Sequence, residues 1–166
     1  MTLADFTRPA LVLPSLRGRD APGVIHELSV ALHREGIVPD LLPFYHTALN
    51  REFLLRTDFE SGLACPHARL PGVTTPAFAF GRSDEPLAWH PRFSHPVRLV
   101  FLLALPVSDA APGLAMFSCL AQLARDTPLL DLIRQSDDAG SIFEALSLVA
   151  VGRRHPAAPA TSAAGY

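Results

Sequence analysis

Residues 62–69, Gly-Leu-Ala-Cys-Pro-His-Ala-Arg, place an imidazole at the end of a short segment of small and apolar residues. The apolar residues predict a short strand, and Pro66 fixes its own φ and biases Cys65 towards extended geometry. The side chain of His67 is therefore held at a strand end by a stiff backbone. Ala68 and Arg69 beside it make this a poor place to bury a histidine. An imidazole held in this way is suited to act as a nucleophile or as a ligand.

The basic residues restrict the chemistry further, because all 14 are arginine and none is lysine. This excludes a Schiff-base lysine, a pyridoxal-phosphate enzyme, a phosphate loop of the usual kind and a kinase-type nucleotide clamp. Any anion that this protein binds must be bound by arginine.

Composition sets the size and class of the protein. With 166 residues, 49% of them hydrophobic, the chain is long enough for one domain with a proper core. A formal net charge of -2 provides no broad electropositive surface, so nucleic-acid binding is not expected. The longest apolar run, residues 97–107, is interrupted by Arg98 and Pro106, so no direct membrane insertion is expected.

The N-terminus and the cysteines predict a cytoplasmic protein. The first residues lack the basic region, apolar region and small-residue cleavage site of a secretory signal. Cys65 and Cys119 are the only cysteines, so a disulfide framework is not indicated and a reducing compartment is expected.

Hydrophobic periodicity and turn residues predict an α/β fold, a single-domain sandwich with one mixed β-sheet flanked by helices. Asp20 is expected to cap the N-terminus of the first helix, and Gly36 is expected to end it. The helices are expected at residues 21–35, 40 to 50–53, 113–125, 128–135 and 138–150. Residues 10–13 are expected to form a first strand or an extended entry segment. Strands are also expected in the segment that holds His67, at 77–80 and, as the central buried strand, at 99–105, with a loop over 81–96. Residues 1–151 form the predicted domain, and the tail 152–166, rich in Pro, Ala, Ser and Gly, is predicted to be disordered.

Several motifs in order carry a family resemblance. Asn50-Arg51-Glu52 is followed, 16 positions after Arg51, by His67 within residues 62–69. This arrangement resembles the enzyme IIA component of the bacterial phosphoenolpyruvate-dependent phosphotransferase system, in its fructose, mannitol and nitrogen-regulatory class. In that family an Arg-Glu pair ends a helix, and a Gly-Val-Ala-Ile-Pro-His-Ala/Gly segment bears the phosphorylated histidine. The similarity runs from about Ala10 to Leu148 and includes the apolar strand at 97–103 and the helical residues 120–124.

The resemblance implies a sheet flanked by helices and a phosphoryl group carried on His67, with no cofactor. It implies that a histidine phosphocarrier protein is the donor and that a sugar permease domain or a regulatory protein is the target. The chemistry fits, because a neutral imidazole with a pKa of about 6.5 can attack phosphorus and can leave again. Arginine stabilises the charge in such transfers. Arg51 is the favoured phosphate clamp and Arg69 the second candidate.

Each of these residues also has a purely structural interpretation. Arg51 is equally consistent with a surface charge at a helix end, and Arg69 with a solvated loop arginine. Cys65 is interpreted as a small apolar packing residue. The other six histidines do not have the spacing of metal ligands, so no metal is expected.

Within the segment that bears the histidine, Leu63 and Cys65 replace the Val and Ile of the family, and three further departures bear on function. Many members carry a second histidine where this chain has Gly113. The flexible residues that the family has before the active histidine are here Asp58 and Glu60. If these carboxylates face His67, they repel phosphate by like charge.

Three functions therefore stay open at the level of sequence. The first is a working phosphocarrier, and the absence of a fused permease or phosphocarrier domain favours a nitrogen-regulatory type of use. The second is a regulatory binding module that kept the fold and lost efficient transfer. The third, a hydrolase that pairs Cys65 or Cys119 with a histidine, is disfavoured. Cys65 and His67 lie two positions apart, which is awkward for pairing, and Cys119 is predicted to be on a buried helix face.

Overall fold

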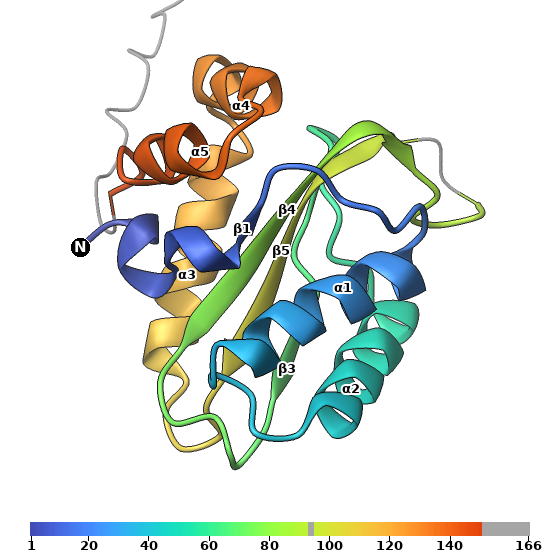
Figure 1. Cartoon of the computed structure of the whole chain (residues 1–166), viewed down its shortest axis with the longest axis vertical. Helices are drawn as coiled ribbons and strands as arrows, with labels where there is room; N and C mark the ends of the chain where they lie inside the picture. Colours follow the sequence, from blue (N-terminus) through green and yellow to red (C-terminus); the bar gives the residue numbers. More distant parts are fainter. Residues whose placement is uncertain (93–94, 151–166) are drawn as a thin grey trace, which may run out of the picture.

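The computed structural model describes residues 1–92 and 95–150. One mixed sheet lies between two layers of helices, with α1 and α2 on one side and α3, α4 and α5 on the other (Figure 1). The strand order is β1-β4-β5-β2, and β3 also pairs with β5. β4 and β5 are antiparallel, whereas β1 runs parallel to β4 and both β2 and β3 run parallel to β5. The strands are β1 (Val12–Leu13), β2 (Leu63–Ala64), β3 (His67–Arg69), β4 (Ala77–Leu87) and β5 (Val97–Leu105).

Aspartates begin three of the α-helices, because their side chains accept hydrogen bonds from backbone N–H groups of the first turn. Asp20 accepts from the Gly23 N–H at 2.8 Å, and Asp138 accepts from the Ser141 N–H at 2.8 Å. Asp126 does the same for α4. The helical elements are η1 (Leu3–Phe6), η2 (Pro9–Leu11), α1 (Ala21–Arg34), α2 (Leu41–Leu54), α3 (Ala111–Leu123), α4 (Thr127–Gln135) and α5 (Ala139–Leu146).

β5 is the central strand and supplies side chains to both cores. Alternate residues of a strand point to opposite faces of a sheet, so Phe101 and Leu103 pack on the side of α3, α4 and α5. Val100 and Leu102 pack against α1 and α2. Because both faces are covered, residues 99–105 of β5 are all apolar, and this unbroken run predicted a central buried strand.

The structure confirms the predicted α/β sandwich with one mixed sheet. The helices lie where they were expected, although α5 ends at Leu146 rather than at residue 150. Two strand predictions are corrected. The expected strand or extended entry segment at 10–13 is a 3-10 turn, η2, followed by the two-residue β1. The expected loop over 81–96 is wrong in its first part, because β4 continues to Leu87.

The continuation of β4 contains Gly81 and Pro86, which weaken a strand prediction. The pairing with β5 shifts register between Arg82 and Leu87, and proline is tolerated at such an irregularity. The predicted disordered tail, residues 152–166, lies outside the described residues.

Candidate functional site

His67 begins β3, directly after a break in the sheet edge. β2 and β3 pair with the same strand, with Leu63 opposite Leu99 and His67 opposite Leu103. Between them, Pro66 has no N–H to donate, but its carbonyl accepts from the Leu103 N–H at 2.9 Å. The backbone is therefore anchored on both sides of the histidine, as the sequence predicted.

The His67 ring is half-buried and has a defined tautomer. Its Nδ1 lies 3.2 Å from the carbonyl oxygen of Cys65, and a carbonyl can only accept, so Nδ1 carries the proton. This leaves Nε2 unprotonated, with a lone pair available to an electrophile. The ring of Phe117 on α3 meets the imidazole edge to face, with 4.9 Å between the centroids, and helps to fix its orientation.

The electrostatic surroundings keep His67 neutral. Burial lowers the pKa of the imidazole, and the positive charges of Arg51 and Arg69 lower it further. The hydrogen bond with the Cys65 carbonyl and the negative charge of Glu52 act in the opposite direction, but the pKa remains below its ordinary value of about 6.5. At neutral pH the ring is therefore a neutral nucleophile, and both sequence-predicted arginines lie close enough for their charges to act on it.

Arg51 and Arg69 come from different elements and are held differently. Arg51 is in the last turn of α2, partly buried, and in the described part of the chain no hydrogen bond or ion pair of its side chain is recorded. Arg69 is anchored to the loop before α3, because its Nη1 donates to the carbonyls of Pro106 at 3.1 Å and Asp109 at 3.5 Å. Arg51 is thus a cation with unused donors, whereas Arg69 is a fixed one.

Gly113 makes room for the Arg69 guanidinium. A Cβ at position 113 would lie 3.1 Å from Arg69 Nη2 and 3.2 Å from a methyl group of Leu105. This glycine stands where the family resemblance implies a second histidine. In this chain the space in front of α3 therefore contains a guanidinium instead of an imidazole.

A buried carboxylate organises the chain that leads to His67. Glu52 is 4% exposed and accepts three hydrogen bonds, from the Thr57 N–H at 3.1 Å, the Thr57 hydroxyl at 2.7 Å and the Trp89 indole N–H at 3.0 Å. The Thr57 hydroxyl in turn accepts from the Cys65 N–H at 3.0 Å. Cys65 then accepts from His67 through its carbonyl. This series, the Glu52 network, connects the end of α2 to the imidazole.

Sequence reasoning missed three residues of this arrangement, Thr57, Trp89 and Phe117, and assigned no role to Glu52. The Arg-Glu pair pointed to position 52. However, charged residues at helix ends are usually exposed, so the sequence pattern did not indicate that Glu52 is buried. The single tryptophan of the chain was the one available indication of a buried acceptor, because a buried indole N–H needs a hydrogen-bond partner.

The carboxylates at 58 and 60 do not act as the sequence suggested. Asp58 is ion-paired with Arg56, with 2.5 Å between Nη2 and Oδ2, and this pairing lowers the pKa of Asp58. Its side chain is 3% exposed, so its charge is compensated within its own loop. Neither carboxylate is among the groups whose charge acts on His67. The positive charge of Arg56 therefore offsets the negative charge of Asp58, and the expected repulsion of phosphate by Asp58 is weakened.

The cysteines do not form a nucleophile with His67. Cys65 is 1% exposed, and burial raises the pKa of its thiol well above the ordinary value. Burial also raises the pKa of Cys119, which is on the buried face of α3. Protonated, inaccessible thiols are poor nucleophiles, so the geometry argues against the hydrolase hypothesis.

Among residues 1–92 and 95–150, no group of three or more His, Cys, Asp and Glu side chains is arranged to hold a metal ion. In the same residues, no helix combines the length and the apolar character that crossing a bilayer requires.

The fold and the site together define a class, an α/β protein that presents one neutral imidazole beside two arginines. The chain belongs to the family described as phosphoenolpyruvate-dependent sugar phosphotransferase system, EIIA 2, whose model matches residues 5–148. It is 31% identical to a nitrogen regulatory protein of Bradyrhizobium diazoefficiens, over 89% of this chain and 96% of that one. A phosphocarrier role in general follows from this membership.

Solved structures show the same fold. The nitrogen regulatory protein IIA-Ntr from Neisseria meningitidis superposes with a TM-score of 0.73 at 22% identity, covering 87% of this chain and 98% of that chain. The enzyme IIA for mannitol from Escherichia coli, solved in complex with phosphorylated enzyme IIB, gives a TM-score of 0.69 at 15% identity, covering 82% and 94%.

Proposed function

We propose that this protein carries a phosphoryl group on Nε2 of His67, accepts it from a histidine phosphocarrier protein and uses it as a regulatory signal. The observation that carries the proposal is the hydrogen bond from Nδ1 of His67 to the Cys65 carbonyl, at 3.2 Å, in a half-buried ring beside two arginines. It assigns the proton to one nitrogen and leaves the other free to react.

The transfer is an in-line displacement at phosphorus. The Nε2 lone pair of His67 forms a new N–P bond while the N–P bond of the donor phosphohistidine breaks, and the donor nitrogen recovers its lone pair. The proton on Nδ1 of His67 stays in place. The His67 ring becomes positively charged as the bond forms, and the Cys65 carbonyl then accepts a charge-assisted hydrogen bond from it. The same change reverses when the group is passed on.

The charges around the ring match both halves of the product. The Glu52 carboxylate favours the positive ring, because its charge acts to raise the pKa of His67. Arg51 has unused donors for the equatorial oxygens of the phosphoryl group, whose negative charge the two guanidinium groups offset. Arg69, fixed on the loop before α3, adds a second cation without moving. The site thus stabilises the transferred group mainly by preorganised charge.

Exposed apolar side chains next to the site fit a protein as the phosphoryl donor rather than a small molecule. Phe53, Leu54 and Leu55, which follow the Arg51-Glu52 pair, are 61%, 84% and 59% exposed. Leu114 at the start of α3 is 66% exposed. Large exposed apolar side chains around a reactive group are typical of a protein–protein contact. The similarity to nitrogen regulatory proteins supports regulatory use, in the cytoplasm where such donors act, over dedicated sugar transport. The mannitol complex illustrates a protein acceptor.

The test is intact-mass measurement after incubation with phosphoenolpyruvate, the first enzyme of the system and the phosphocarrier protein. The wild-type chain is expected to gain the mass of one phosphoryl group in an acid-labile form. His67→Ala should gain nothing, whereas His26→Ala, which removes an exposed histidine of α1, should be phosphorylated like the wild type. An unmodified wild type, with the phosphocarrier protein itself phosphorylated, would contradict the proposal and favour the binding module without transfer.

A further inference from the structure

A polar pocket lies at the opposite end of β5 from His67. It has a volume of about 400 Å³, within the range of roughly 300–1,000 Å³ typical of small-molecule sites. Pro96 and Arg98 at the start of β5 line it, whereas His67 pairs with Leu103 near the other end of that strand. At about 3.3 Å per residue, the five residues from position 98 to 103 separate the two sites by roughly 16 Å.

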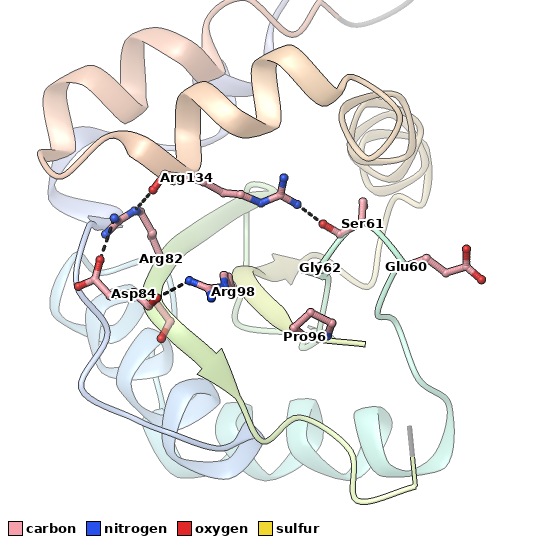
Figure 2. A pocket seen from close by; sticks show the side chains of 9 residues that line it. Glu60, Ser61, Gly62, Arg82, Asp84, Pro96, Arg98 and Arg134 are labelled. Carbon is pink, nitrogen blue, oxygen red and sulfur yellow. Dashed lines mark hydrogen bonds and ion pairs between the residues drawn. The ribbon is translucent and has the colours of Figure 1, made fainter. Parts of the chain in front are cut away.

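Three arginines from different elements converge on this pocket, Arg82 from β4, Arg98 from β5 and Arg134 from α4 (Figure 2). Arg82 is a structural residue, because it donates to the carbonyls of Arg134 and Pro14 and pairs with Asp84 at 2.8 Å. Its role is to join β4 to α4 and to hold the other cations in place.

Arg98 and Arg134 keep donors that the protein does not use. Arg98 donates from Nη1 to the backbone carbonyl of Asp84, a neutral acceptor, and no ion pair of Arg98 is recorded in the described residues. Arg134 pairs with Asp131 on its own helix at 3.0 Å and also donates to the carbonyl of Ser61. Both guanidinium groups retain N–H donors in the planar arrangement that binds carboxylate and phosphate oxygens in pairs.

The carboxylates of the lining do not cancel this charge. Two acidic residues line the pocket with the three arginines, and Asp131, outside the lining, pairs with Arg134, so within the described residues Arg98 is the lining arginine without an ion pair. Asp84 is already paired with Arg82. Figure 2 shows the Glu60 carboxylate pointing away from the arginines.

A buried hydroxyl at this pocket has no partner. The Oγ of Ser61 is inaccessible and makes no hydrogen bond within the described part of the chain. Buried polar atoms are nearly always paired, so the unpaired hydroxyl indicates that hydrogen bonding is incomplete at the Ser61–Gly62 turn, which lines the pocket. Ser61 also adjoins Gly62, whose φ of +85° and close approach to the Pro96 carbonyl fix the turn.

We propose that this pocket binds a small organic or inorganic anion through a carboxylate or phosphate group, held chiefly by Arg98 and Arg134. The site is separate from the phosphorylated histidine and does not depend on the proposed transfer. The ligand would contact the Ser61–Gly62 turn, from which β2 and then His67 follow.

The test is a titration of the unphosphorylated full chain, followed by proton–nitrogen correlation NMR, with inorganic phosphate in one arm and succinate in the other, at constant chloride. Saturable shifts are expected at the amides of Ser61, Gly62 and Arg98 in at least one arm, and the arm that saturates identifies the ligand group. Arg98→Gln is expected to weaken binding about tenfold or more. The control Arg125→Gln removes an exposed arginine outside the pocket and should bind like the wild type.

Two results would overturn the proposal: no saturable shift with either probe, or equal affinity in the wild type and Arg98→Gln. The same spectra report whether each variant is folded. If Arg98→Gln does not fold, Arg98→Lys keeps the charge and loses the planar fork, and it is expected to bind several-fold more weakly. Equal affinity of Arg98→Lys and wild type would then count against the site. Because no phosphoryl transfer is involved, failure here leaves the role of His67 untouched.

Discussion

Replacing Glu52 should lower the free energy of unfolding more than replacing any exposed Asp or Glu residue would. Its side chain is 4% exposed and accepts from the Thr57 N–H, the Thr57 hydroxyl and the Trp89 indole N–H at 3.1, 2.7 and 3.0 Å. Glu52→Ala removes the acceptor from all three donors. The indole N–H is the most costly of these, because Trp89 is 6% exposed and water has little access to it.

The size of the effect follows from these contacts. An orphaned buried donor costs about 1–3 kcal/mol, and each of the two part-buried Thr57 bonds contributes about 0.5–1.5 kcal/mol. Some of this is recovered because the Thr57 groups can turn to water. Glu52→Ala is therefore expected to lower the free energy of unfolding by about 3 kcal/mol. Glu52→Gln keeps an acceptor for the indole and should cost about 1 kcal/mol.

The assay is urea unfolding at neutral pH, followed by Trp89 fluorescence and by circular dichroism. Glu60→Ala is the matched control, because it removes a nearby exposed carboxylate and should change stability by less than about 0.5 kcal/mol. In a double-mutant cycle followed by circular dichroism alone, because Trp89→Phe removes the only tryptophan, Glu52→Ala and Trp89→Phe should cost less together than the sum of the single changes, by about 1 kcal/mol. If Glu52→Ala unfolds within about 0.5 kcal/mol of the wild type, the Glu52 network does not hold the site.

Four further predictions concern the site and the segment that leads to it. Arg51→Gln should raise the pKa of His67, because it removes a positive charge that opposes protonation, and NMR titration of the ring would contradict this with an unchanged or lower pKa. In the wild type, whose His67 pKa is depressed, the unfolded state binds the proton first, so the free energy of unfolding should fall as pH drops below about 6.5. Gly62→Ala should cost about 2–4 kcal/mol in urea unfolding, because φ is +85° and a Cβ would lie 2.7 Å from a backbone oxygen. Gly36→Ala, with φ +73° and open space, should cost about 1–2 kcal/mol, and equal costs would refute the steric argument. Cys65 should resist iodoacetamide in the folded protein, as read by peptide mass, since burial raises the pKa of its thiol; labelling at the rate of a free thiol would contradict its burial.

The elements that follow simple patterns could be predicted from the sequence. α1 is marked by its Asp20 cap and its periodic apolar face, and β5 by the unbroken apolar run of residues 99–105. The end of β4 could not be predicted, because Gly81 and Pro86 are typical of loops and only the register shift against β5 explains their place in a strand. Such a shift depends on the partner strand, which local sequence does not specify.

The part of the candidate site that could be predicted is the part marked by short motifs and their spacing along the sequence. The segment before His67 and the spacing from Arg51 predicted a reactive imidazole and its favoured cation, and in the structure the charge of Arg51 lowers the pKa of the His67 ring. The burial of Glu52 and its bond to Trp89 join residues 37 positions apart and left no local pattern. The meaning of Gly113 also required the structure, because only there does the guanidinium of Arg69 lie against it.

The most direct test of the account is proton–nitrogen correlation NMR of the protein after phosphorylation by the phosphocarrier protein. The spectrum identifies which imidazole nitrogen carries the phosphoryl group. The hydrogen bond from Nδ1 to the Cys65 carbonyl predicts a phosphoryl group on Nε2 of His67, with the proton retained on Nδ1. A phosphoryl group on Nδ1, or on any other histidine, would contradict it.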